Sequence, residues 1–193
     1  ETWLAEGPVD GVYFLPALDV EPPLEAMDLE TWHAALDRRV KMLYTLLHGL
    51  PGDVFLVCGT RMGGLHGYTA AGATAPLGGA VTGFAKAYAQ ERAAAMVKAV
   101  DFAPESDDRE IAAQLIEETL RDPAVVEVGR KGDQRFGIGL LEQSVAAGRP
   151  LEPGSVFVVT GGAGGITVHI VADLARASRG TFYLTGRTPL PDP

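Results

Sequence analysis

The sequence is poor in cysteine and in basic residues, and both shortages limit what the protein can do. Its single cysteine, Cys58, excludes an internal disulfide framework and favours a reducing compartment, so we expect a cytoplasmic protein. Its 16 Lys and Arg residues are outnumbered by 25 Asp and Glu residues, which gives a net charge of −9. Such a chain lacks the basic surface that binds nucleic-acid phosphates, and nucleic acid is not expected as a partner.

Convincing membrane segments and a secretory signal are also lacking. Two stretches without a charged residue are long enough to span a bilayer, between Arg61 and Lys86 and between Glu152 and Asp173. Glycines break both stretches, a pattern that favours strand, turn and helix pieces over a membrane helix. Residues 1–6 have neither the basic nor the apolar region of a signal peptide. No membrane association is therefore expected.

Apolar residues are plentiful, and they predict an alternating order of strands and helices in the N-terminal part. Hydrophobic residues make up 47% of the chain, which excludes a disordered acidic tail. The spacing of apolar residues and the positions of Gly and Pro predict strands over 11–15, 53–60, 95–102, 125–129 and 134–141, and helices over 29–50, 76–92 and a segment capped by Ser106. This alternation favours a parallel sheet flanked by helices.

A connector over 142–154 separates this part from a second, shorter α/β pattern. After the connector we expect a strand over 156–160, a helix over 166–177 and a strand over 181–185. The predicted organisation is therefore an N-terminal unit over 1–141, the connector, and a second unit over 155–193. Both are expected to be Rossmann-like α/β units built on parallel sheets.

The second unit contains the most informative motif of the sequence. An apolar strand runs into Thr160, Gly161, Gly162, Ala163, Gly164, Gly165 and Ile166, where an amphipathic helix with the apolar positions Ile166, Ile170, Val171 and Leu174 begins. Such a turn lets backbone amides approach a pyrophosphate closely, and the helix N-terminus contributes partial positive charge. The motif therefore predicts a dinucleotide site, with a tight turn that binds no ligand as the alternative.

The residues after the next strand bear on which dinucleotide is bound. That strand ends in Gly186 and Arg187, and the next acidic residue is Asp192. A carboxylate at this position holds the ribose hydroxyls of NADH, whereas a cation suits the 2′-phosphate of NADPH. Arg187 therefore favours NADPH, and an ordinary solvated arginine is the alternative.

The glycine motif resembles the cofactor motif of short-chain dehydrogenases, and is most similar to that of ketoreductase domains of modular polyketide synthases and polyunsaturated fatty-acid synthases. Upstream segments strengthen the resemblance: 9–15, 54–57, 79–91, 98–101, 125–130 and 135–136. The resemblance implies that 1–141 is a truncated structural subdomain that binds no cofactor. Residues 155–193 would be the opening β-α-β of the NADPH-binding catalytic subdomain.

The resemblance also implies an activity and partners. Such enzymes reduce the β-keto group of an acyl thioester carried by the phosphopantetheine arm of an acyl carrier protein, and they contact neighbouring synthase domains. The family's catalytic Ser, Tyr and Lys or Asn follow the second strand of the catalytic subdomain. No tyrosine here, Tyr183 included, has that position. We therefore interpret the chain as an inactive piece of a larger enzyme, without catalytic residues of its own.

One residue of the motif departs from the family pattern. Thr167 stands where the family has a third glycine, which permits close packing of helix and strand. A β-branched residue there is expected to loosen or shift the turn, or to donate its hydroxyl to a phosphate. The sequence leaves these two outcomes open.

Other polar residues are assigned structural roles. The four histidines have no metal-ligand spacing, and Cys58 lies in an apolar strand where it is expected to be inert. Solvated helix faces are the simplest interpretation of three groups: Asp107–Asp108, Glu117–Glu118 and the basic cluster 38–41, which could alternatively contact an acidic carrier protein. The glycine pairs 63–64 and 78–79 do not connect a strand directly to a helix, which favours a non-binding sheet.

Two further functions stay open. The chain could be a non-catalytic scaffold for contacts between synthase domains, or part of an unrelated nicotinamide-dependent dehydrogenase.

Overall fold

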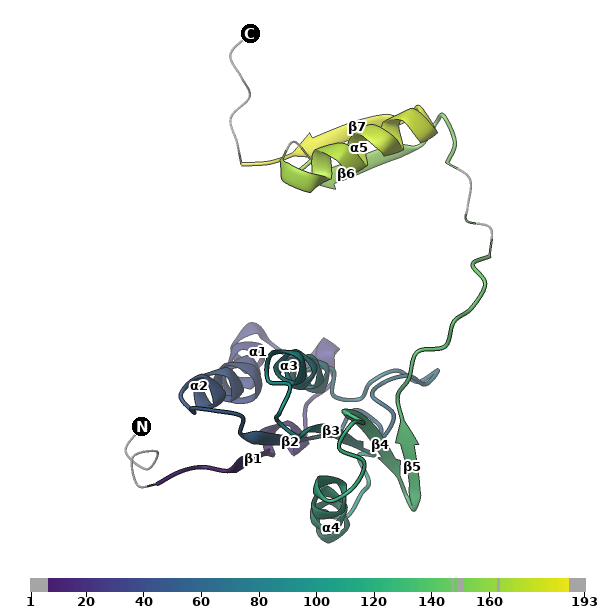
Figure 1. Cartoon of the computed structure of the whole chain (residues 1–193). Coiled ribbons are helices and arrows are strands. Elements are labelled where there is room, and N and C mark those ends of the chain that lie inside the picture. Colours follow the sequence, from purple (N-terminus) through teal and green to yellow (C-terminus); the bar gives the residue numbers. More distant parts are fainter. Residues whose placement is uncertain (1–6, 147, 149–150, 163, 188–193) are drawn as a thin grey trace. The chain divides into compact units, whose positions relative to one another are not determined.

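The computed structural model shows two compact units, Glu1–Leu140 and Leu141–Pro193, which we describe separately (Figure 1). The described residues are 7–146, 148, 151–162 and 164–187. None of the helices formed by these residues combines the length and the apolar character needed to cross a membrane.

Unit 1 is built on a five-stranded sheet in the order β1-β2-β3-β4-β5. The strands are β1 (Gly11–Phe14), β2 (Phe55–Thr60), β3 (Val97–Phe102), β4 (Glu127–Lys131) and β5 (Gln134–Gly137). The first four are parallel, and β5 forms an antiparallel hairpin with β4. Every residue of β3 and all but the first of β2 are buried, as expected for central strands covered on both faces.

The helices of unit 1 lie on both faces of this sheet. They are α1 (Leu29–Leu36), a π-helical segment η4 (Asp37–Lys41), α2 (Met42–His48), α3 (Gly78–Glu91) and α4 (Asp108–Thr119), with short 3₁₀ turns at Pro16–Leu18 and Leu24–Ala26. One core packs α2 and α3 against β1, β2 and β3, and a second packs α4 against the opposite face (Figure 1). Strands β1 to β4 follow one another across the sheet in a single direction. The crossover that contains α4 therefore has the opposite handedness to the crossovers that contain α2 and α3.

The helix expected over 29–50 is interrupted by the π-helical segment and ends at His48. Its buried positions Ala35, Arg39, Leu43 and Leu47 follow one another at intervals of four. An α-helix has 3.6 residues per turn, so four-residue steps would drift around it. The wider π turn keeps these side chains on one face. It also buries Arg39, so the basic cluster 38–41 is not wholly the solvated face that we expected.

Helix α4 corrects two further expectations. Its N-cap is Asp107, not Ser106, because the Asp107 carboxylate accepts hydrogen bonds from the amides of Arg109 and Glu110. Glu118 is fully buried where we expected a solvated face. Its carboxylate accepts hydrogen bonds from Arg130 and Arg135 of the β4–β5 hairpin, so ion pairing joins the helix to the sheet edge.

Unit 2 contains β6 (Val156–Thr160), α5 (Gly165–Ser178) and β7 (Thr181–Thr185), with the strands parallel. Phe157 and Phe182 stack at a centroid distance of 4.7 Å and lie among the less exposed strand residues. Helix α5 runs along one face of the two strands (Figure 1). The packed side of α5 passes through Val171 and Ser178. Ile166 and Ile170 are therefore exposed, although the apolar pattern placed them on the packed stripe.

Candidate functional site

The turn between β6 and α5 depends on glycine at two positions. Gly161 has φ +66° and Gly165 has φ +51°, both in the left-handed region that glycine adopts without strain. The chain therefore reverses sharply after Thr160, and α5 begins at Gly165.

Backbone hydrogen bonds fix this turn to the end of β7. The amide of Gly161 donates to the carbonyl of Thr185 at 2.6 Å, and the amide of Gly164 donates to the carbonyl of Gly161 at 3.2 Å. A side chain at Gly162 would place its Cβ 2.8 Å from Leu184 Cδ2, so the side chain of Leu184 would have to move. The turn is thus held close to the neighbouring strand.

Three amides in and directly after the turn have no hydrogen-bond acceptor among the residues that the structure describes. Among the described residues, the amides of Gly162, Gly165 and Ile166 have no hydrogen-bond acceptor. The helix has no side-chain cap and no acidic residue in its first turn. No described side chain at this end therefore neutralises its partial positive charge, the condition under which a helix N-terminus attracts an anion. Ala163, also assigned to this site, lies outside the described residues.

The second part of the candidate site begins at the same sheet edge. The register pairs Thr160 with Thr185, so the turn after β6 and the segment after β7 leave the sheet side by side. Gly186 and Arg187 are exposed, and within the described range Arg187 forms no ion pair or hydrogen bond. A Cβ at Gly186 would meet no atom within 4 Å. An unengaged guanidinium thus follows the strand next to the glycine turn.

Thr167 lies on the packed side of α5, where it is half-buried. Its amide donates to the carbonyl of Gly164 at 3.2 Å, so the first turn of the helix still closes around it. The β-branched side chain is accommodated beside the sheet, and a hydrogen bond from its hydroxyl to a phosphate stays a prediction.

The equivalent position of unit 1, between β2 and α3, is closed by the chain's own side chains. The buried carboxyl group of Asp101, at the end of β3, accepts hydrogen bonds from Thr60 Oγ1 at 2.8 Å, from the Met62 amide at 2.6 Å and from the His66 amide at 2.8 Å. The glycine-rich loop after β2 is therefore bound to the neighbouring strand.

A carboxylate also lies at the N-terminus of α3. The amide of Leu77 donates to Glu21 Oε1 at 3.4 Å, and Arg39 Nε lies 3.7 Å from Glu21 Oε2. A negative side chain at this end of the helix opposes the binding of a second anion. Sequence reasoning missed both Glu21 and Asp101, because the backbone amides that each binds lie more than 30 positions away and no local pattern marks them.

The histidine and cysteine residues considered as functional candidates have structural roles. His66 Nε2 lies 3.0 Å from the carbonyl of Val128, and its Nδ1 lies 3.4 Å from Thr82 Oγ1. Cys58 is buried in β2, and burial raises the pKa of its thiol, which keeps it protonated and unreactive. A search of the described residues finds no group of three His, Cys, Asp or Glu side chains able to hold a metal ion.

Comparison with known proteins gives a similarity to a solved structure that bears on the fold. No family model and no curated protein matches the sequence. The fold is similar to that in the crystal structure of a ketoreductase domain from the bacillaene assembly line, with a TM-score of 0.51 and 20% identity. The match covers 84% of this chain and 36% of that one, so this chain spans about a third of its length. The expected α/β fold with parallel sheets is confirmed.

Proposed function

We propose that unit 2 is the opening β-α-β of an NADPH-binding subdomain, and that the turn Thr160–Ile166 holds the pyrophosphate. The observation that carries this proposal is the set of three amides, of Gly162, Gly165 and Ile166, that have no acceptor in the described part of the chain. They belong to a helix N-terminus without a cap or an acidic side chain. A pyrophosphate would satisfy those donors and meet the positive end of the helix dipole.

The residues around the turn fit the rest of this cofactor. Arg187 offers its guanidinium to the 2′-phosphate, and Gly186 leaves the strand end open where the ribose would lie. NADPH supplies a hydride when bound, while the residues of this chain bind and orient it. No residue of this chain is assigned a proton-transfer role, so we expect the chain alone to bind the cofactor without reducing a substrate.

The whole protein to which this chain belongs is, in this proposal, a ketoreductase of a polyketide or fatty-acid synthase in the cytoplasm. The fold similarity to a ketoreductase domain supports that choice. It would reduce a β-ketoacyl thioester to the β-hydroxy product, with an acyl carrier protein and neighbouring synthase domains as partners. Unit 1 would support the catalytic subdomain without binding cofactor, since Glu21 already occupies the N-terminus of α3.

A purely structural role is the second candidate, and the closed turn of unit 1 favours it for that unit. A chain that served only as a scaffold would need no anion site in unit 2. Binding of NADPH to the intact chain therefore separates the two functions.

The test is a titration of the full chain with NADPH, followed by cofactor fluorescence. We expect a dissociation constant on the order of 10 μM, and at least a tenfold weakening by Arg187→Glu because a cation is replaced by an anion. Arg179→Glu is the matched control: Arg179 is also exposed, but it caps the opposite end of α5. Equal effects of the two variants would contradict a local role for Arg187. Absence of NADPH binding to a folded wild-type chain would contradict the cofactor site.

A further inference from the structure

A groove on unit 1 is separate from the candidate cofactor turn and has no role in the proposed function. It measures about 680 Å³ and is lined by Tyr68, Lys86, Glu127 and the segment Gly137–Leu140. A smaller hollow of about 180 Å³ shares Tyr68, Lys86 and Glu127 with it, so the two are continuous. The space is within the range of small-molecule sites.

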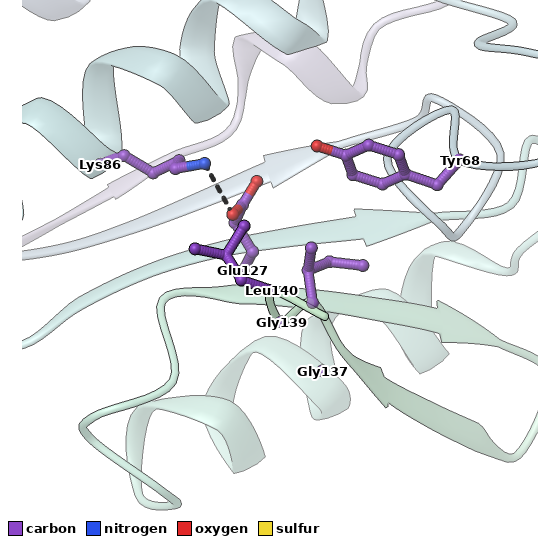
Figure 2. Close-up of a pocket in the computed structure, with 7 residues that line it drawn as sticks. Tyr68, Lys86, Glu127, Gly137, Gly139 and Leu140 are labelled. Carbon is purple, nitrogen blue, oxygen red and sulfur yellow. Dashed lines mark ion pairs between the residues drawn. The ribbon is translucent and has the colours of Figure 1, made fainter. Parts of the chain in front are cut away.

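The polar groups of the groove gather at one place. Lys86 Nζ of α3 and Glu127 Oε2 of β4 form an ion pair at 2.8 Å, with the lysine half-exposed and the glutamate largely buried. Figure 2 shows this pair in the groove and the hydroxyl of Tyr68 pointing toward it. The hydrogen bond and the charge of Glu127 raise the pKa of Lys86, so its ammonium group stays protonated at neutral pH.

This cluster has unused hydrogen-bonding capacity. An ammonium group has three protons, and the described residues take one of them, through Glu127. The second oxygen of Glu127 and the hydroxyl of Tyr68 have no hydrogen-bond partner in the described part of the structure. Donors and an acceptor therefore face the same space side by side.

Two glycines of α3 leave space beside the groove, although no neighbouring atom requires a glycine at either position. Gly79 and Gly83 both line its smaller hollow. A Cβ at Gly83 would meet no atom within 4 Å, and one at Gly79 would only touch Met62 Sδ at 4.0 Å. Glycine inside a helix costs about 1 kcal/mol relative to alanine. Two such residues one turn apart leave the helix backbone accessible beside Lys86.

We propose that this groove binds a small, linear, uncharged amide attached to an apolar chain. Lys86 and Glu127 neutralise each other, so an ionic head group would meet a like charge at close range. An amide instead presents an acceptor to Lys86 or Tyr68 and a donor to Glu127. Ile138 and Leu140 form the apolar wall for the chain.

The probe is N-pentylacetamide, titrated into the full chain and followed by backbone amide NMR shifts. We expect saturable shifts along α3 and β4 with a dissociation constant on the order of 1 mM. Hexanoate, which has the same pentyl chain on a carboxylate, should bind at least about fivefold more weakly. A short peptide of alanine and leucine provides the same amide from a polypeptide source. Binding of the peptide without the small amide would overturn the proposal.

Two variants test whether the ligand binds in the groove. Gly83→Val fills open space and should weaken N-pentylacetamide binding about tenfold. The matched control, Ala80→Val, adds the same kind of side chain at an exposed position of α3 outside the groove and should leave binding unchanged. Lys86→Met should weaken binding about fivefold through loss of the head-group donor. Unchanged binding in a folded Gly83→Val chain, or hexanoate binding as tight as that of the amide, would overturn the proposal.

Discussion

The connection between β2 and α3 and the connection between β6 and α5 solve the same geometric problem with different chemistry. Each leads from the end of a parallel strand to the start of a helix. In unit 1 the loop is long, Asp101 binds it to β3, and Glu21 accepts a hydrogen bond at the helix N-terminus. In unit 2 the turn is short, its bonds are backbone bonds, and no acidic side chain is present in the first turn of the helix.

This difference shows that the α/β fold does not by itself make an anion site. Both helices have a positive N-terminal end, because their peptide dipoles are aligned. In α3 that end already meets a carboxylate of the chain, whereas in α5 it meets none among the described residues. In the proposed function, the side chain at the helix N-terminus decides which unit binds the phosphate groups of the cofactor.

The largest effect is expected from removing the carboxyl group that closes the loop of unit 1. Asp101→Ala leaves a buried hydroxyl, a buried amide and a partly buried amide without their acceptor. We expect it to lower the free energy of unfolding by about 4 kcal/mol, as measured by urea denaturation. Asp108→Ala is the matched control, because Asp108 also pairs with the loop, through Arg61, but is exposed. The control should cost less than about 1 kcal/mol. Equal losses would show that Asp101 does not close the loop.

A smaller, pH-dependent effect is expected at Glu118, whose ion pairs have no equivalent in the described part of unit 2. Burial alone would raise the pKa of this carboxyl, but hydrogen bonds from Arg135 and Arg130 outweigh it and leave the pKa below the ordinary 4.5. A lowered folded-state pKa contributes stability above 4.5 that is lost as the pH falls through the folded value.

Glu118→Gln tests this contribution. The variant should lower the free energy of unfolding by about 3 kcal/mol near neutral pH, since it removes the one fully buried carboxylate that Arg130 and Arg135 share. The arginines then keep only the more exposed carboxylates of Glu117 and Asp122 as partners. Between about pH 6 and pH 3 the wild type should lose more stability than the variant, as measured by urea denaturation. Parallel pH curves would contradict the assignment. Glu110→Gln, on the same helix and without an arginine partner in the described structure, is the control.

The sequence predicted most of the elements because their causes are local. The predicted strands over 156–160 and 181–185 have the observed boundaries, since apolar runs end at glycines or at the connector. The motif around Gly161 and Gly165 is equally local, because a turn with positive φ angles requires glycine in the sequence itself.

The features that could not be predicted from the sequence depend on residues that are distant in the chain. Glu118 was interpreted as solvated because its neighbours in sequence are polar, and only the β4–β5 hairpin, which brings Arg130 and Arg135 to it, buries it. Ile166 and Ile170 were placed on the packed stripe, but a helix above two strands buries only one narrow side. The face of the sheet that each helix covers likewise has no local signal.

Helix α3 has a carboxylate at its N-terminus, and adding one to α5 tests most directly whether that charge prevents cofactor binding. Ile166 is exposed at the start of α5, so Ile166→Glu removes little packing and adds a negative charge beside the unneutralised amides. That charge should stabilise the helix by about 0.5 kcal/mol, as seen in thermal denaturation. In the fluorescence titration, it should also weaken NADPH binding about tenfold, or about 1.4 kcal/mol. Ile166→Gln changes shape equally without the charge and should retain most of the affinity. A variant that gains stability while losing cofactor affinity would assign the site to the helix N-terminus itself, because damage to the fold would lower both. Equal affinities of the Glu and Gln variants would place the pyrophosphate elsewhere.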